Sequence, residues 1–347
     1  MRKIKYLRGI IAGVILMVCL TGCTKEAFSK EIVFTTGLSG SEIFKIGGLP
    51  CTVSEARLLL ANVRNQYEEA FGEEIWQQEI DGKSFQIYVK DMVKNQLAQL
   101  KCMVLYAQEE GISLTEEEEA VLKKAADSYY ESLDSEEQML LGATQADVQK
   151  LYENLAVSEK LYDMLTRDVE EEISDAEAKV IVVWHIFKDY TGASDEERAA
   201  KKQEMINLRE QILTGGADFA FLAEEYSDDD RLEYAFGRGE MEQSFEEAAF
   251  ALEAGEVSDI VETENGCHII KCISDYDEER TRQNKTEMLK KRKQEAFDRE
   301  YAEYSKGLLS EFNTNAWEGI VFEELSGVDN KNLYEVYEEY WQEFAEQ

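Results

Sequence analysis

The sequence predicts an α+β protein in which helical segments at both ends of the chain flank an inserted small α/β domain. Apolar residues recur at helical spacing from residue 53 to 169 and again near the C-terminus. Between these segments, "VIVVWHIF" and "GCHIIKCI" are β-rich runs. The chain contains one proline, Pro50, which is compatible with long uninterrupted helices. We expect segments 41–173 and 276–347 to pack together and to display the α/β domain, 174–275.

The helical segments carry start and stop signals. An apolar stripe runs through "SFQIYVKDMVKNQLAQLKCMVLYAQEEG", and Gly111 is expected to end that helix. Thr115 and Glu118 fit a capping box for the next helix. The aromatic end, "LYEVYEEYWQEF", is typical of a packed amphipathic helix. The basic stretch "RQNKTEMLKKRKQ" is expected to pair with acidic helices of the same chain.

The central segment predicts the order β, α, α, a short strand near Phe236, α, β, β. Ser194 is expected to begin the first helix and Asp218 the second. The third helix, "SFEEAAFALEAG", is expected to start with a capping box of Ser244 and Glu247. This order describes a small α/β domain.

Both histidines of the chain fall in the β-rich runs. Strand alternation places His185 on a face with Val183, and His268 on a face with Ile270. If the two strands are neighbours, both imidazoles point into one site; otherwise they are two unrelated core histidines, each bound to a backbone group. The final strands read as a hairpin, with Asn265-Gly266 as a type I′ turn.

Four cysteines remain beyond the N-terminal region: Cys51, Cys102, Cys267 and Cys272. Cys267 and Cys272 are five residues apart on one expected strand, so they face opposite sides and cannot bond to each other. The spacings do not resemble a zinc site. An exported chain could pair cysteines, but we expect buried free thiols, no bound metal and no cofactor.

The formal net charge is −36, which excludes a partner bound through its phosphates, such as a nucleic acid. The same charge repels anionic membrane surfaces, so membrane attachment needs another cause. The N-terminus offers one. A basic start, "MRKIKYLRG", precedes a short apolar run that ends in "LTGC", and these features together resemble a bacterial lipobox.

The lipobox resemblance implies that residues 1–22 are a lipoprotein signal, that Cys23 is lipidated, and that 23–40 form a tether. A plain secretory signal or a membrane anchor with a chance cysteine is the alternative. Lipidation would place the protein outside the cytoplasm, anchored to the bacterial cell membrane. The sequence leaves open whether the chain forms a homodimer.

From about Lys179 to Ile273 the sequence resembles a parvulin-type peptidyl-prolyl isomerase. The matching stretches are "HIF", "ADFAFLAEEYSDD", "FGRGEM", "FEEAAFALEAGEVSDIVET" and "GCHIIK", in the family's order and at nearly its spacing. Helical segments with such an insert behind a lipobox resemble the PrsA-type extracytoplasmic foldases, with SurA as the periplasmic relative. The helical segments then correspond to a chaperone module, and the partners implied are unfolded exported polypeptides with X–Pro bonds.

The resemblance also assigns site residues. It places His185 and His268 in a paired-histidine catalytic core, and Asp229 at a position that relatives fill with Cys or Asp. Asp228 is one residue away, so this register can slip by one. A second set of residues would line the proline pocket: Met241, Phe245 and Phe236. The alternative for these three is ordinary core packing.

One feature departs from the family. Relatives usually carry a Gly-Gly-Asp-Leu-Gly run before "FGRG", whereas "DDDRLEYAFGRGEM" lacks it and is shorter; Leu232 is a candidate for the missing leucine. The alternative function is therefore a non-catalytic holdase with a degenerate parvulin domain. A surface solute-binding lipoprotein is disfavoured by the long helical segments, and a protease by the lack of triad or metal spacing.

Overall fold

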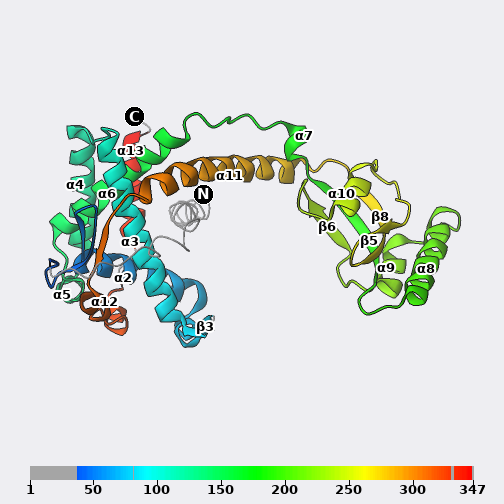
Figure 1. Cartoon of the computed structure of the whole chain (residues 1–347), viewed down its shortest axis with the longest axis horizontal. Helices are drawn as coiled ribbons and strands as arrows, with labels where there is room; N and C mark the ends of the chain where they lie inside the picture. The colour runs from blue at the N-terminus through cyan, green and yellow to red at the C-terminus, as the bar shows by residue number, and fades with distance from the viewer. Residues whose placement is uncertain (1–36, 81, 330–331, 346–347) are drawn as a thin grey trace. The chain divides into compact units, whose positions relative to one another are not determined.

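The computed structural model describes residues 37–80, 82–329 and 332–345. The chain divides into two compact units. The helical unit contains the described residues up to Asp168 and from Gln294 onward, and the α/β unit is Val169–Lys293 (Figure 1). The predicted α/β domain, 174–275, lies within the second unit, which also includes the first half of the long helix α11. The expected α+β class, with a small sheet-containing insert in a mainly helical chain, is confirmed.

The helical unit joins both ends of the described chain around one core. Strand β1 pairs with β9, so N-terminal and C-terminal segments share a sheet of order β2-β1-β9. Phe297, Tyr301 and Tyr337 from the C-terminal segment are buried in the same cluster as the N-terminal helices. No helix of the described residues is long and apolar enough to cross a membrane. The elements are β1 (Glu42–Ile46), β2 (Leu49–Thr52), α2 (Val53–Phe71), η1 (Glu73–Gln77), β3 (Glu79–Ile80), β4 (Lys83–Ser84), α3 (Phe85–Glu109), α4 (Glu116–Ser132), α5 (Ser135–Leu141), α6 (Gln145–Thr166), β9 (Ser310–Phe312), α12 (Thr314–Glu318), η2 (Glu323–Gly327) and α13 (Leu333–Ala345).

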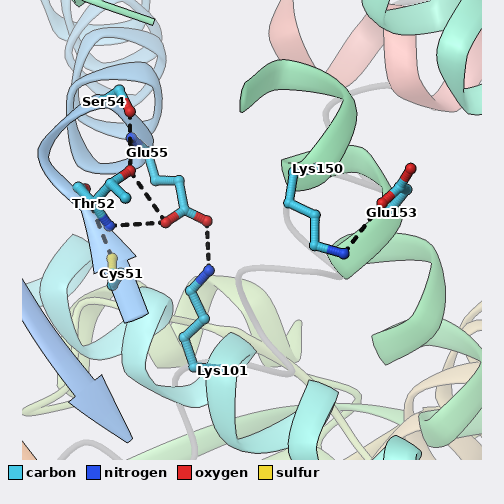
Figure 2. A network of polar contacts seen from close by, with 7 residues as sticks. All are labelled: Cys51, Thr52, Ser54, Glu55, Lys101, Lys150 and Glu153. Atoms are coloured by element: carbon cyan, nitrogen blue, oxygen red, sulfur yellow. Dashed lines mark hydrogen bonds and ion pairs between the residues drawn. The ribbon is translucent and has the colours of Figure 1, made fainter. Parts of the chain in front are cut away.

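Helix ends in this unit follow the local signals. Thr115 and Glu118 form the expected capping box of α4. Gly111 follows α3 with a φ of 73°, a backbone conformation that glycine adopts without steric penalty. Thr52 and Glu55 form a further capping box at α2. In Figure 2, the Glu55 carboxylate of this box also accepts a hydrogen bond from the Lys101 ammonium on α3, with an Nζ–Oε1 distance of 2.5 Å.

The α/β unit has the predicted order of elements. A four-stranded antiparallel sheet, β6-β5-β8-β7, packs between helices. Ile186 and Ile269 on one face contact α8 and α9, and Val183 and Ile270 on the other face pack under α10. The bounds are α7 (Asp175–Ala178), β5 (Ile181–Asp189), α8 (Asp195–Leu213), α9 (Phe219–Tyr226), β6 (Glu233–Phe236), α10 (Gln243–Phe250), β7 (Val261–Glu262), β8 (Gly266–Ser274) and α11 (Glu278–Ser305).

Ser194 and Asp218 cap α8 and α9 as expected, but two local predictions are wrong. The N-cap of α10 is Glu242, without a side-chain cap. The Ser244 hydroxyl instead lies 2.9 Å from the Glu262 carbonyl oxygen, to which it donates, and 3.0 Å from the Glu242 carboxylate. The Asn265-Gly266 turn is the other error, because Gly266 is the first residue of β8 and does not have a positive φ.

Close approach of two strands explains Gly266. A Cβ atom there would lie 2.1 Å from the Lys188 carbonyl oxygen and 2.5 Å from the Phe187 ring. The chain reverses one residue earlier, where the Thr263 amide donates to the Gly266 carbonyl oxygen. Tertiary packing against β5, rather than turn chemistry, therefore requires the glycine.

The basic stretch at the start of α11 pairs with acidic residues of its own unit. Lys285 lies 2.5 Å from Asp175, Lys293 lies 2.7 Å from Glu171, and Arg292 pairs with Glu177. These partners belong to the short helix α7 and the segment before it, so the expected internal pairing is confirmed. The four cysteines of the described residues are buried free thiols, also as expected.

Candidate active site

The pairing of β5 with β8 brings the two histidines together. In this antiparallel pair Phe187 is opposite His268, and His185 is opposite Ile270, so the imidazoles are diagonal neighbours on one face. The two Nδ1 atoms are 3.3 Å apart. His185 is 4% exposed and His268 8% exposed, so both rings lie beneath the surface.

Asp229 holds one end of this pair. Its Oδ2 atom is 3.0 Å from His185 Nε2 and accepts a hydrogen bond of 2.7 Å from the Tyr234 hydroxyl, while its Oδ1 atom accepts from the Arg231 amide. Asp228 points elsewhere and accepts from the backbone amide of Asp189. Of the two neighbouring aspartates, Asp229 is therefore the one that contacts His185.

The other end of the chain of hydrogen bonds is Thr263, whose Oγ1 lies 3.1 Å from His268 Nε2. One arrangement of protons satisfies each contact between these four side chains, provided that the Thr263 hydroxyl hydrogen points toward His268 and not toward the Gly266 carbonyl oxygen 3.2 Å away. The Thr263 hydroxyl donates to His268 Nε2, His268 Nδ1–H donates to His185 Nδ1, and His185 Nε2–H donates to Asp229. Each imidazole is then a neutral tautomer that donates once and accepts once.

The pKa shifts agree with neutral rings. Burial lowers the pKa of His185, although Asp229 acts in the opposite direction. Burial and the neighbouring His185 lower the pKa of His268 to about 3. Burial opposes ionisation of Asp229, but hydrogen bonds from the Arg231 amide, Tyr234 and His185 outweigh it and lower the pKa of this carboxyl. At pH 7 the site holds one carboxylate and two uncharged imidazoles.

Aromatic side chains form the apolar part of the site. The Phe245 ring stands edge-on to both imidazoles, with centroid distances of 5.9 Å to His185 and 5.1 Å to His268. Phe236 contacts Phe245 at 5.8 Å, and Phe187 stacks on His268 at 4.7 Å. Aromatic rings in such edge-on and offset contacts fix one another's orientation.

The three residues assigned to the proline pocket share one cluster but differ in exposure. Phe236 and Phe245 are 3% and 2% exposed and serve as core. Met241 is partly buried against them and is the member of the three that can contact a ligand at the surface. Truncation of Phe245 is therefore expected to disturb the core as well as any pocket, whereas Met241 can be changed more cleanly.

Sequence reasoning missed Tyr234, Thr263 and Phe187 as parts of the site. Tyr234 lies two residues before Phe236 on β6, so strand alternation would have placed it on the same face. No sequence pattern identified Thr263, because its contact with His268 depends on where the hairpin between β7 and β8 reverses. Cys23 lies outside the described residues. Within those residues, no group of three or more His, Cys, Asp or Glu side chains could hold a metal ion.

The chain is similar to known peptidyl-prolyl isomerases and foldases. The family model of the PPIC-type PPIase (rotamase) domain matches residues 185–274. The foldase protein PrsA of Caldanaerobacter subterraneus subsp. tengcongensis is 29% identical over 279 residues, which cover 78% of this chain and 82% of that protein. The peptidyl-prolyl cis-trans isomerase Pin1 of Digitalis lanata is 44% identical over 92 residues, 24% of this chain and 78% of that protein. The crystal structure of PrsA from Bacillus cereus aligns at 19% identity with a TM-score of 0.36, covering 90% of this chain and 98% of that one.

The chain belongs to the PPIC-type, or parvulin, family of peptidyl-prolyl cis-trans isomerases. The matched domain falls within the α/β unit, which segments of the helical unit flank in the sequence on both sides. Over most of its length the chain is similar to the foldase protein PrsA.

Proposed function

We propose that this protein is a lipid-anchored extracytoplasmic foldase, whose α/β unit isomerises X–Pro bonds of exported polypeptides while they fold. The observation that carries the proposal is the complete hydrogen-bonded chain from Asp229 through His185 and His268, beside the surface of Met241. The PrsA foldase relative, along most of its length, supports the same function.

The chemistry requires no covalent step and no proton transfer. Rotation about an X–Pro bond is slow because amide resonance must be broken, at a barrier of about 18–20 kcal/mol. The planar resonance form separates charge, so apolar surroundings favour the twisted amide. Neutral, fully hydrogen-bonded imidazoles beneath the pocket supply polar groups that need no water and add no charge. His185, His268 and Asp229 would thus shape the pocket.

Isomerase activity can be tested with the purified protein in refolding of a substrate whose slow phase is limited by a proline. We expect the protein to accelerate this phase and Met241→Ala to lower kcat/KM by about tenfold, because a buried apolar contact is lost. Met139→Ala is the matched control, since Met139 is 74% exposed on α5 of the other unit. Equal activity of wild type and Met241→Ala would contradict the role of Met241.

A non-catalytic holdase is the second candidate, favoured by the short segment between Asp229 and Phe236. A holdase would suppress aggregation of the refolding substrate without changing the rate of the proline-limited phase. Wild-type protein with that behaviour would overturn the isomerase proposal and leave the chaperone function.

The proposed anchor is the lipid on Cys23, because the acidic chain cannot bind an anionic membrane through its charge. Cells that express Cys23→Ala should incorporate no labelled palmitate into the protein, and the variant should leave the lipid-modified pool. Incorporation at the wild-type level would rule out this anchor.

A further inference from the structure

Exposed large apolar side chains are concentrated in one short stretch of the helical unit. Phe71, Ile80, Ile87 and Tyr88 are 64%, 38%, 50% and 45% exposed, and they lie where α2 ends, where β3 and β4 form a short hairpin, and where α3 begins (Figure 1). These four are among twelve exposed large hydrophobic residues of the described chain, yet they fall within eighteen residues. We call these four side chains the apolar end. Several exposed apolar groups close together are more often an interaction site than single exposed apolar residues are.

The apolar end is held in place by aromatic packing beneath it. The Tyr67 ring contacts Phe71 at 6.0 Å, Trp76 at 6.2 Å and Phe85 at 5.3 Å. Phe85, which is buried, stacks on Tyr88 at 5.9 Å. The exposed rings therefore extend from an ordered core, and a ligand that covers them need not first order them.

An acidic hollow adjoins this surface. It has a volume of about 500 Å³ and is lined in part by Arg64, Glu68 and Trp76. The Arg64 charge is already neutralised by Glu68, with an Nη1–Oε2 distance of 2.9 Å, and Glu68 also accepts from the Trp76 indole. Glu73 and Glu74, also in the lining, are exposed and have no ion-pair partner among the described residues. The hollow therefore carries uncompensated negative charge beside an aromatic wall.

We propose that the apolar end and the acidic hollow together bind segments of unfolded polypeptide in which apolar side chains alternate with lysine or arginine. Apolar residues of the segment would cover Phe71, Ile87 and Tyr88, and a basic side chain would enter the hollow between Glu73 and Glu74. This inference rests on the proposed foldase function and specifies which stretches of a client the helical unit takes.

Charge selects this occupant over others. A second copy of the chain would bring its own excess of acidic residues, within a net charge of −36, toward the same acidic rim. Anionic lipid and nucleic acid are repelled for the same reason. A cationic, apolar segment gains from both features of the surface.

The test uses the purified protein and a proline-free peptide of fifteen residues that alternates leucine, phenylalanine and lysine, read by anisotropy of an uncharged fluorophore. We expect Phe71→Ser/Ile87→Ser to weaken binding by at least about tenfold, through lost apolar contact. Glu73→Gln/Glu74→Gln should weaken it by roughly threefold to tenfold and reduce its salt dependence.

Matched controls come from similar residues elsewhere. Phe221→Ser removes a phenylalanine that is 60% exposed on α9, and Glu116→Gln/Glu117→Gln removes two exposed acids from α4; both should leave peptide affinity unchanged. A companion peptide with glutamate in place of lysine should bind at least about tenfold more weakly. Equal loss in control and test variants, or equal binding of the two peptides, would overturn the proposal.

Analytical sedimentation tests the alternative that the apolar end joins two copies of the chain. If wild type dimerises, Phe71→Ser/Ile87→Ser is monomeric and both bind peptide equally, the surface joins copies of the chain and the proposal is wrong. Because the peptide lacks proline, this result is independent of isomerase activity. If the wild type has no isomerase activity, the proposed isomerisation is wrong, but the peptide-binding proposal still stands.

Discussion

The two units bury polar side chains in opposite ways. In the α/β unit, His185 and His268 are neutral and share hydrogen bonds that end at the partly exposed Asp229. In the helical unit, Lys101 and Glu55 form an ion pair whose side chains are 3% and 6% exposed (Figure 2). The first network lies on the sheet face that packs against α10, and the second lies where β2, α2 and α3 meet.

This difference follows from the energetics of charge. A buried ion is tolerated only while its partner is present, so an ion pair suits a junction that never opens. Neutral imidazoles that donate and accept once each keep their hydrogen bonds when a ligand excludes water. The contrast teaches that burial and polarity alone do not identify a site. What distinguishes the α/β network is that its two imidazoles are uncharged and that it ends at a partly exposed carboxylate, Asp229.

The largest expected effect tests the ion pair. Lys101→Met leaves the Glu55 carboxylate buried without its cation, so we expect the free energy of unfolding to fall by about 3–5 kcal/mol. Urea denaturation followed by far-ultraviolet circular dichroism measures this loss. Lys123→Met is the control, because its pair with Asp127 is exposed and should contribute under about 1 kcal/mol. A loss no greater than in the control would mean that the buried pair does not stabilise the junction.

A second test sharpens the contrast through pH. The folded pKa of His268 is lowered to about 3 from an ordinary value of 6.5, so its contribution is complete above pH 6.5 and falls as pH drops toward 3. At pH 5 the α/β unit should therefore have lost roughly 2 kcal/mol of its stability at neutral pH. Hydrogen exchange of amides in β5 and β8, measured at pH 7.5 and 5, gives the opening free energy of the α/β unit separately from that of the helical unit. In His268→Gln the difference should shrink; an unchanged difference would assign it to other groups.

The helical unit should respond in the opposite direction. Burial raises the pKa of Glu159 to about 7, against hydrogen bonds from Tyr337 and Trp341 that lower it. A raised carboxyl pKa adds stability that is complete below pH 4.5 and is lost as pH rises through 7. Amides of α6 and α13 should therefore become better protected on acidification. Glu159→Gln should reduce that gain, and the remainder belongs to Glu338, whose pKa is also raised to about 7 by burial. Parallel pH profiles in the two units would contradict this contrast.

A smaller effect is expected from Tyr234→Phe, which removes one hydrogen bond to the Asp229 carboxylate. Loss of a hydrogen bond to a charged group should lower the stability of the α/β unit by about 1–2 kcal/mol and raise the pKa of Asp229. Tyr226→Phe is the control, since Tyr226 is exposed on α9. Carboxyl titration by nuclear magnetic resonance reads the Asp229 pKa, and an unshifted titration would show that Tyr234 does not hold this carboxylate.

The smallest effect concerns substrate charge. Lys188, at the end of β5, is already paired with Glu204 at 3.4 Å and Asp228 at 3.7 Å, and Asp195, Glu196 and Glu197 follow. A phosphorylated Ser-Pro peptide should therefore bind about twofold to tenfold more weakly than its unmodified twin. Calorimetry of the two peptides measures the ratio. Tighter binding of the phosphopeptide would contradict this prediction, because it would show that Lys188 or another cation is available to the phosphate despite these ion pairs.

Local patterns predicted the elements because their causes are local. Helical spacing and the caps at Thr115, Ser194 and Asp218 depend on residues three or four apart. Where a competing contact came from elsewhere in the fold, the same reasoning failed. Ser244 donates its hydroxyl to the distant Glu262 carbonyl, and Gly266 serves strand packing.

The sequence by itself determined that two histidines lie on strands, that alternation turns them to one face each, and that four cysteines are buried without bonding. Only the tertiary structure decided that Phe187 is opposite His268, that Asp229 rather than Asp228 meets the ring, and that Thr263 completes the chain. It alone paired Lys101 with Glu55, forty-six positions apart. Side-chain direction repeats with the local backbone and can be read from spacing, whereas these contacts depend on strand register and helix packing between distant segments, which no local period encodes.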